Sequence, residues 1–251
     1  MTKLRAIRPP VPGAVPKTAM VMAAGLGKRM RPLTATRPKP LVEVAGKALL
    51  DHVFDRLRAA GVERAVVNVH YLADALEAHL HSRVSGIEVI VSDERRRLME
   101  TGGGLVQARD LLGDDPVVVV NSDNLWLDGP IDAIRMLAAR WDADEMDALL
   151  LLVPLARAHN HGGQGDFHLD KQGRIIARRA RGRLAPFVYT GVQILSPRLI
   201  VDWPEGPFST MLFWERAIAA GRAYGLVHQG LWFDVGYPAA IARTEAMLAD
   251  G

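Results

Sequence analysis

Short apolar runs alternate along the first half of the chain with stretches whose apolar residues recur at helical spacing. The run 117–120 is wholly apolar, which is typical of a parallel strand covered on both faces. This alternation predicts an α/β fold with a doubly wound, mostly parallel, Rossmann-like sheet, whose ligands would bind at the carboxyl ends of the strands. Strands are predicted at 18–24, 65–69, 87–91, 117–120 and 148–153, and helices at 48–60, 72–81, 104–112 and 131–140.

The pattern changes near Gly165, where the second half of the chain begins to favour a hairpin. No obvious linker separates the halves, and no internal repeat is present. Residues 18–251 are therefore predicted to form a single domain, with a half at 18–153 and a smaller lobe at 154–251. Residues 1–17, rich in proline and basic residues, are predicted to be a flexible tail. In the second half, a hairpin is predicted at 167–177, strands at 187–195 and 231–233, and helices at 208–220 and 238–248.

Composition excludes several classes of protein. The net charge is only +3 over 251 residues, so a general nucleic-acid surface is not predicted. The chain has no cysteine, which excludes disulfides and cysteine metal sites. No apolar run approaches the length of a membrane span, so no membrane partner is expected and the predicted location is the cytoplasm. The cations cluster at 28–39, 94–97 and 174–183, which suits either small anionic ligands or a solvated surface.

The segment after the first strand combines glycines, cations and prolines. It contains Gly25, Gly27 and Lys28, and it ends with Lys39 between two prolines. Glycine lets backbone N–H groups approach an anion closely, and basic side chains add positive charge. The dinucleotide fingerprint is excluded because Met30 stands where it needs glycine, and the Walker-type loop is excluded because no Ser or Thr follows Lys28. A phosphate-binding loop of another kind is predicted.

The run GLGKRMRPLT at 25–34, followed by PKPL at 38–41, resembles the signature of the sugar-1-phosphate nucleotidyltransferases, or NDP-sugar pyrophosphorylases. The resemblance extends more loosely from Thr18 to the C-terminus. It implies an enzyme that joins an NTP to a sugar 1-phosphate, releases pyrophosphate and uses Mg2+ as cofactor. The expected partners are these two small molecules, and the expected assembly is a monomer or a small homo-oligomer. The half at 18–153 would bind the nucleotide and the lobe at 154–251 the sugar.

Two acidic residues follow apolar strands. Asp123 comes directly after the strand predicted at 117–120, and Asp234 follows the strand predicted at 231–233. From the residues alone, each is a metal ligand or an ordinary turn or capping aspartate. The resemblance implies that both bind the catalytic Mg2+. They lie more than a hundred residues apart in the sequence, so they can meet only if both strands end on the same side of the fold.

The glycine run 102–104 opens a predicted helix and offers N–H groups to a ligand, although a flexible loop would have the same composition. By resemblance, Arg29 would hold the triphosphate and Lys39 would stabilise the transition state, so Arg29, Lys39 and Asp123 are the expected catalytic residues. Some relatives carry a base-reading glutamine where this chain has Arg95, which leaves the base open. The resemblance implies nucleotide contacts at Ala23, Ala24, Gly25, Gly27, Lys28, Arg29, Lys39, Thr101 and Gly102.

Residues 160–167, NHGGQGDF, are polar and glycine-rich, which suits a sugar site and an ordinary hairpin equally. This segment, like ETGGG at 100–104, resembles the N-acetylmuramic acid 1-phosphate uridylyltransferases within the family. Plain core is the alternative role for Tyr189, and Arg178 is a further candidate contact to the sugar phosphate. The sugar-binding residues implied by the resemblance are Asn160, Gly165, Asp166, Tyr189 and Thr190.

The leading expectation is uridylyl transfer from UTP to N-acetylmuramic acid 1-phosphate, which would serve cell-wall recycling. A mannose-1-phosphate guanylyltransferase or a glucose-1-phosphate thymidylyltransferase is the alternative within the class. A sugar-nucleotide sensor without activity would belong to a different class. It is disfavoured because Arg29, Lys39, Asp123 and Asp234 are all present.

Overall fold

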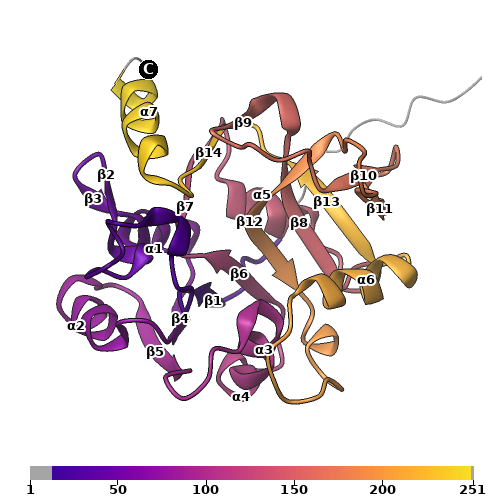
Figure 1. Cartoon of the computed structure of the whole chain (residues 1–251). Coiled ribbons are helices and arrows are strands. Elements are labelled where there is room, and N and C mark those ends of the chain that lie inside the picture. The colour runs from indigo at the N-terminus through magenta and orange to yellow at the C-terminus, as the bar shows by residue number, and fades with distance from the viewer. Residues whose placement is uncertain (1–12, 250–251) are drawn as a thin grey trace, which may run out of the picture.

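A nine-stranded sheet runs through the middle of the molecule, with helices packed on both of its faces (Figure 1). The computed structural model describes residues 13–249. The strand order is β11-β10-β12-β6-β1-β4-β5, and β8 joins β12 to β13. The strands of this sheet are β1 (Thr18–Met22), β4 (Arg64–Val69), β5 (Glu88–Asp93), β6 (Val117–Asn121), β8 (Ala148–Pro154), β10 (Phe167–Leu169), β11 (Ile175–Arg178), β12 (Phe187–Leu195) and β13 (Ala223–Val227).

The first half of the chain supplies the parallel part of the sheet, as the sequence predicts. Strands β6, β1, β4 and β5 are all parallel neighbours. The second half makes the sheet mixed, because β12 runs antiparallel to both β6 and β8. The predicted α/β class is confirmed, and β12 joins the two halves of the chain into one sheet.

Side chains alternate between the two faces of the central strands. In β1, Ala19 and Val21 face one core, whereas Met20 faces the other. The first core is covered by α1 (Leu49–Ala60), α2 (Ala73–Arg83) and α5 (Ala133–Arg140). The second is covered by α3 (Glu100–Gln107), α4 (Arg109–Leu112) and α6 (Met211–Ala219). Burial on both faces explains why these strands read as continuous apolar runs.

The sequence pattern did not predict several elements, most of which are short. They include β13 and three segments beside the basic loop: β2 (Glu43–Val44), β3 (Lys47–Ala48) and β7 (Asn124–Leu127). The helix predicted at 104–112 begins earlier, so that the glycine run lies inside α3. The other elements outside the main sheet are η1 (Lys28–Met30), η2 (Lys39–Leu41), η3 (Leu155–Arg157), η4 (Pro197–Leu199), β9 (Ala158–His159), β14 (Leu231–Asp234) and α7 (Pro238–Ala249).

A small sheet, β7-β14-β9, brings the end of the chain back to the carboxyl ends of the central strands. Its register places Asp234 opposite Asn124, the residue after Asp123. Beneath the basic loop, Met30 and Phe233 are fully buried in a third core that joins this loop to β14. Met30, the residue that excludes a dinucleotide fingerprint, is therefore the apolar anchor of the loop.

The chain is already packed before the first strand. Val15 lies against the main core, and the carbonyl of Lys17 accepts hydrogen bonds from the N–H groups of Glu63 and Arg64. The rest of the predicted tail, residues 1–12, lies outside the described residues. Among residues 13–249, no helix is both long and apolar enough to cross a bilayer.

Candidate active site

Two adjoining cavities lie where β1 and β6 end. The first has a volume of about 420 Å³ and is lined by the loop after β1 and by the start of α3. The second has a volume of about 160 Å³ and is lined by β12, β14 and the basic loop. Both are bounded by Lys39, Asn121 and Asp123, so the predicted catalytic lysine and aspartate stand at the junction.

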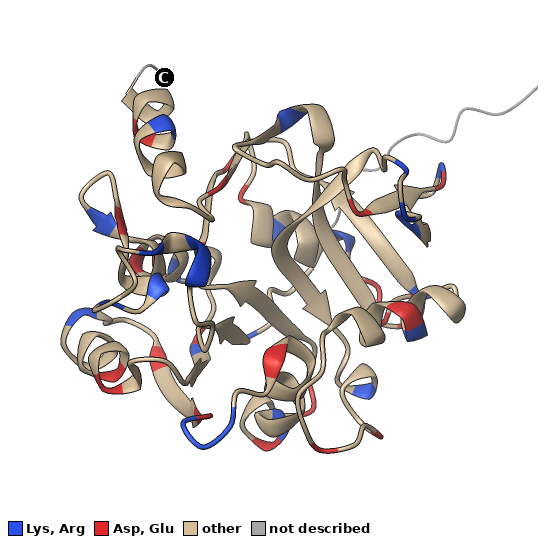
Figure 2. Ribbon diagram, viewed as in Figure 1, with Lys and Arg blue, Asp and Glu red and all other residues tan. Residues whose placement is uncertain are grey.

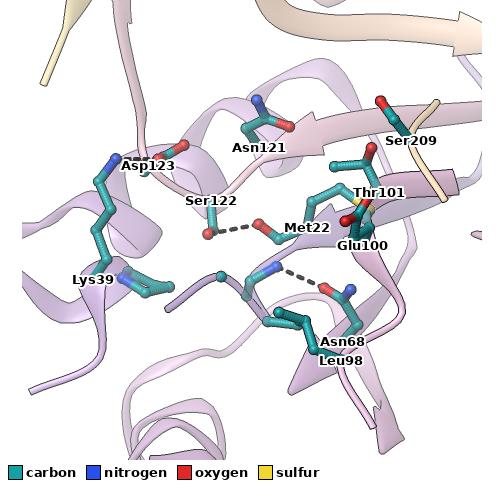
Figure 3. Close-up of a pocket in the computed structure, with 14 residues that line it drawn as sticks. Met22, Lys39, Asn68, Leu98, Glu100, Thr101, Asn121, Ser122, Asp123 and Ser209 are labelled. Carbon is teal, nitrogen blue, oxygen red and sulfur yellow. Dashed lines mark hydrogen bonds and ion pairs between the residues drawn. The ribbon is translucent and has the colours of Figure 1, made fainter. Parts of the chain in front are cut away.

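The loop after β1 forms one wall of the first cavity. Ala23, Ala24 and Gly25 line it, as expected for nucleotide contacts. The N–H of Ala23 donates to Asn68 Oδ1 at 2.6 Å, which fixes the backbone of the loop (Figure 3). Asn68 is itself buried in β4, so the loop is anchored to the sheet.

The buried carboxylate of Glu94 links the loop after β1, through Asn68, to the segment that leads into α3. Glu94 accepts hydrogen bonds from Asn68 Nδ2 at 2.7 Å and from the N–H of Met99 at 3.0 Å. Burial raises the pKa of Glu94 and outweighs these two donors, which act to lower it. A Cβ at Gly104 would lie 2.7 Å from Glu94 Oε1, so the close approach of α3 to this carboxylate requires glycine there.

We expect Asn68→Ala to make the loop after β1, which forms one wall of the first cavity, less rigid. The substitution leaves the Ala23 N–H and one oxygen of Glu94 without their partners, which costs about 1–3 kcal/mol of stability per buried group. KM for the NTP should rise by roughly tenfold, with a smaller change in KM for the sugar phosphate. Steady-state kinetics with each substrate varied in turn measure this, and equal changes in both constants would contradict the assignment. Ser82→Ala, on the exposed surface of α2, is the matched control.

Backbone N–H groups of the glycine run in α3 are hydrogen-bonded to a segment from the second half of the chain. The N–H groups of Gly102 and Gly103 both donate to the carbonyl of Phe208, at 2.7 and 3.1 Å. A Cβ at Gly102 would lie 2.5 Å from the Phe208 ring, and one at Gly103 would lie 2.2 Å from the carbonyl oxygen of Gly206. Small residues are therefore needed for segment 206–210 to dock, and these N–H groups do not face a ligand as the sequence had suggested.

Docking of segment 206–210 completes the first cavity. Thr101 Oγ1 accepts a hydrogen bond from the N–H of Thr210 at 2.9 Å, and Thr101 lines the cavity together with Ser209. In the close-up, Thr101, Glu100 and Ser209 stand on one side, and the Lys39–Asp123 ion pair stands on the other (Figure 3). Glu100 also lines the cavity, with a left-handed backbone at φ 58°.

The second cavity is lined by the predicted catalytic and metal-binding side chains Arg29, Lys39, Asp123 and Asp234, together with Asp166. Lys39 forms an ion pair with Asp123, and their side chains are only 13% and 31% exposed. A Cβ at Gly236 would lie 2.7 Å from Asp234 Oδ1 and 3.2 Å from both terminal nitrogens of Arg29. The two aspartates from distant parts of the sequence therefore border one cavity, beside two of the predicted cations.

The environment of Asp234 favours its charged form. Burial acts to raise the pKa of this carboxyl. The hydrogen bond with His161 Nδ1, at 3.4 Å, and the charges of Arg29 and Lys39 act in the opposite direction and prevail, so the pKa lies below its usual value.

The donor set at this cavity fits a divalent cation that prefers oxygen ligands. Within the described residues, no group of three or more His, Asp or Glu side chains gathers as a complete metal site. Mg2+ does not need one, because it is usually held by one or two carboxylates together with substrate phosphates and water. Asp123 and Asp234 supply such carboxylates.

The predicted sugar residues separate into two groups. Asp166, Tyr189 and Thr190 line the second cavity. Asp166 Oδ2 accepts a hydrogen bond from the N–H of Tyr189 at 2.8 Å, and burial raises the pKa of the Tyr189 hydroxyl. Gly165 lies beyond this cavity, in a side cavity, and Asn160 Nδ2 instead donates to Thr244 Oγ1 at 3.0 Å.

Other predicted nucleotide contacts do not line either cavity. Gly27, at φ 60°, and Lys28 lie at the start of η1, where the Gly27 carbonyl accepts a hydrogen bond from the Thr34 hydroxyl at 2.8 Å. Arg95 forms ion pairs with Asp74, Glu77 and Asp93 and does not face the first cavity.

Sequence reasoning missed several residues of the site: Asn68, Glu94, Asn121 and Ser209. Asn68 carried a usable signal, because it is the one polar residue in the apolar run 65–69. Ser209 carried none, since segment 206–210 reaches the cavity only through long-range docking on α3.

Known proteins resemble this chain in sequence and in fold. A family model described as nucleotidyl transferase matches residues 18–177. An N-acetylmuramate alpha-1-phosphate uridylyltransferase of Caulobacter vibrioides is 49% identical over 94% of this chain and 98% of its own length. A mannose-1-phosphate guanylyltransferase catalytic subunit beta of Dictyostelium discoideum is 30% identical over 88% of this chain and 61% of its own length. The solved inositol-1-phosphate CTP transferase of T. maritima shares the fold, with a TM-score of 0.77 and 19% identity over 94% of this chain and 96% of its own.

Proposed function

The chain belongs to the nucleotidyl transferase family, and from that premise we propose that it transfers the uridylyl group of UTP to N-acetylmuramic acid 1-phosphate. Enzymes of this family act on an NTP and a sugar phosphate and work with a divalent metal, for which we propose Mg2+. The products would be UDP-N-acetylmuramic acid and pyrophosphate. We also propose a monomer or small homo-oligomer in the cytoplasm, where UTP is available.

The observation that carries the proposal is the meeting of two cavities at one ion pair. The larger cavity has the room and the backbone wall for a nucleoside, and the smaller one has the polar lining for a sugar. Their shared border at Lys39 and Asp123 is where the α-phosphate of the NTP and the phosphate of the sugar would have to meet.

The reaction needs positioning and charge more than it needs a nucleophilic side chain. A phosphate oxygen of the sugar attacks the α-phosphorus in line, and the bond from that phosphorus to the bridging oxygen of pyrophosphate breaks. The attacking oxygen is already an anion, so no general base is required. Lys39 would stabilise the negative charge around the α-phosphorus, and Arg29 would hold the phosphates that leave.

The metal would act at the same border. Held by Asp123 and Asp234, Mg2+ would supply positive charge to the phosphates of both substrates. Both aspartates border the cavity where these phosphates would lie, and carboxylate oxygens are ligands that Mg2+ prefers.

A matrix of substrates tests the assignment. Purified protein is incubated with Mg2+, with each of UTP, GTP, CTP and TTP, and with each of several sugar 1-phosphates, and pyrophosphate release is measured. We expect the highest kcat/KM for UTP with N-acetylmuramic acid 1-phosphate. Preference for GTP and mannose 1-phosphate would favour the second candidate, which the Dictyostelium relative suggests. Absence of pyrophosphate with every pair would contradict both.

A further inference from the structure

A side cavity opens beside the proposed sugar site. It has a volume of about 170 Å³ and adjoins the second cavity, since Asp166 and Tyr189 line both. Phe167 and Trp214, packed edge to face with ring centroids 5.5 Å apart, give it an apolar wall. Nothing in the proposed reaction uses this space.

Two arginines of the β10–β11 hairpin line the same cavity. Arg178 lies at the end of β11 and Arg179 follows it, on a part of the chain that is marked by basic residues (Figure 2). Their backbone is fixed, because the N–H of Arg179 donates to the carbonyl of Asp166 at 2.6 Å. The cavity therefore combines aromatic surface with positive charge.

Each arginine keeps hydrogen-bonding capacity that the protein does not use. Arg178 Nη1 pairs with Glu215, whereas the one hydrogen-bond partner of Arg178 Nη2 among the described residues is the sulfur of Met211, at 3.3 Å, and a thioether is a weak acceptor. Arg179 is held through Nε by the Gly165 carbonyl at 3.0 Å, and through Nη1 by neighbouring oxygens. Within residues 13–249, Arg179 Nη2 has no hydrogen-bond partner.

This lining matches one substituent of the proposed substrate. N-acetylmuramic acid is N-acetylglucosamine carrying a lactyl ether, that is, one carboxylate and one methyl group. Guanidinium groups bind carboxylates through paired, charge-assisted hydrogen bonds, and an aromatic wall suits a methyl group. The carboxylate of Asp166 also lines the side cavity, where it would oppose a second carboxylate. One of its oxygens is already bound, because it accepts a hydrogen bond from the Tyr189 N–H.

We propose that the side cavity binds the lactyl carboxylate of the sugar, and that Arg178 and Arg179 select an acidic sugar over its neutral counterpart. This inference rests on the proposed function. It assigns the arginines to specificity rather than to the transfer step, since they lie outside both of the cavities that meet at Lys39.

The test compares two sugar phosphates that differ only in the lactyl group. Affinities of N-acetylmuramic acid 1-phosphate and N-acetylglucosamine 1-phosphate are measured by calorimetry, with a non-hydrolysable UTP analogue present, and kinetics are measured with UTP. For Arg178→Gln and Arg179→Gln we expect affinity for the acidic sugar to fall roughly 10- to 100-fold, since each removes a charge-assisted hydrogen bond. Affinity for the neutral sugar should change less than about twofold. Arg183→Gln, an exposed arginine in the same segment, is the charge-matched control.

A gain-of-function variant guards against a trivial loss of folding. Glu215→Gln releases Arg178 Nη1 from its ion pair, so it should strengthen binding of the acidic sugar by a few-fold and leave the neutral sugar unchanged. Equal losses for both sugars, or no loss for either, would overturn the inference while the substrate matrix still supports the proposed function. If the wild-type protein binds and uses both sugars equally well, the inference and the proposed acceptor fail together.

Discussion

Replacing Lys39 with alanine is expected to lower kcat by roughly 100- to 1,000-fold while the protein stays folded, because one preorganised charge at a phosphoryl transition state is worth about 3–4 kcal/mol. Lys39 lies in η2 between Pro38 and Pro40, and its side chain reaches the border of both cavities. KM for either substrate should change less than kcat, since the charge is needed most when the α-phosphorus is attacked.

Single-turnover measurements of pyrophosphate release separate this effect from a change in binding. Lys47→Ala is the matched control. Lys47 lies on the β2–β3 hairpin after η2, forms an ion pair with Asp55 of α1 and lines neither cavity. Turnover of Lys39→Ala within about tenfold of wild type would refute the role of Lys39.

Asp123→Asn is expected to reduce kcat by about the same factor or more, and to raise the Mg2+ concentration needed for half-maximal activity. The side chain keeps its shape and loses its charge. Lys39 then lacks its charged partner, and Asp234 is left as the only one of the two proposed metal ligands that carries a carboxylate.

Metal binding to the variant, measured directly by calorimetry with Mn2+ as the probe, distinguishes a metal ligand from a residue that only orients Lys39. Asp115→Asn is a suitable control, because Asp115 is exposed and precedes β6, whereas Asp123 follows that strand at its other end. Unchanged metal affinity would exclude Asp123 as a ligand. In the double variant with Lys39→Ala, the losses should combine to less than their product, since the two residues form one ion pair.

The sequence predicted the fold well wherever burial produced a periodic signal. The end of α1 is an example: the helix was predicted to end at residue 60, and Gly61, at φ 97°, caps it there. Strands β1, β4 and β6 were equally clear, because covered parallel strands are uniformly apolar. The antiparallel direction of β12 was not predictable in this way, since its residues have the same composition in either direction.

For the site, the sequence identified residues whose chemistry is local. Asp123 and Lys39 stand in short local motifs that carry the family resemblance, and both side chains line the two cavities. Gly102 was assigned to the nucleotide, yet its N–H is bound by Phe208, more than a hundred residues away. Contacts of that range leave no periodic trace in the sequence, which is also why Ser209 was missed.

The docking of Phe208 onto the glycines of α3 has a practical consequence for protein engineering. The wall of the first cavity is built by residues from both halves of the chain, so cutting the chain after β8 would remove part of that wall, including Ser209. Chimaeras that exchange acceptor preference between relatives should therefore take residues 206–210 and α3 from the same parent. A bulkier residue on either side would clash and separate the two segments.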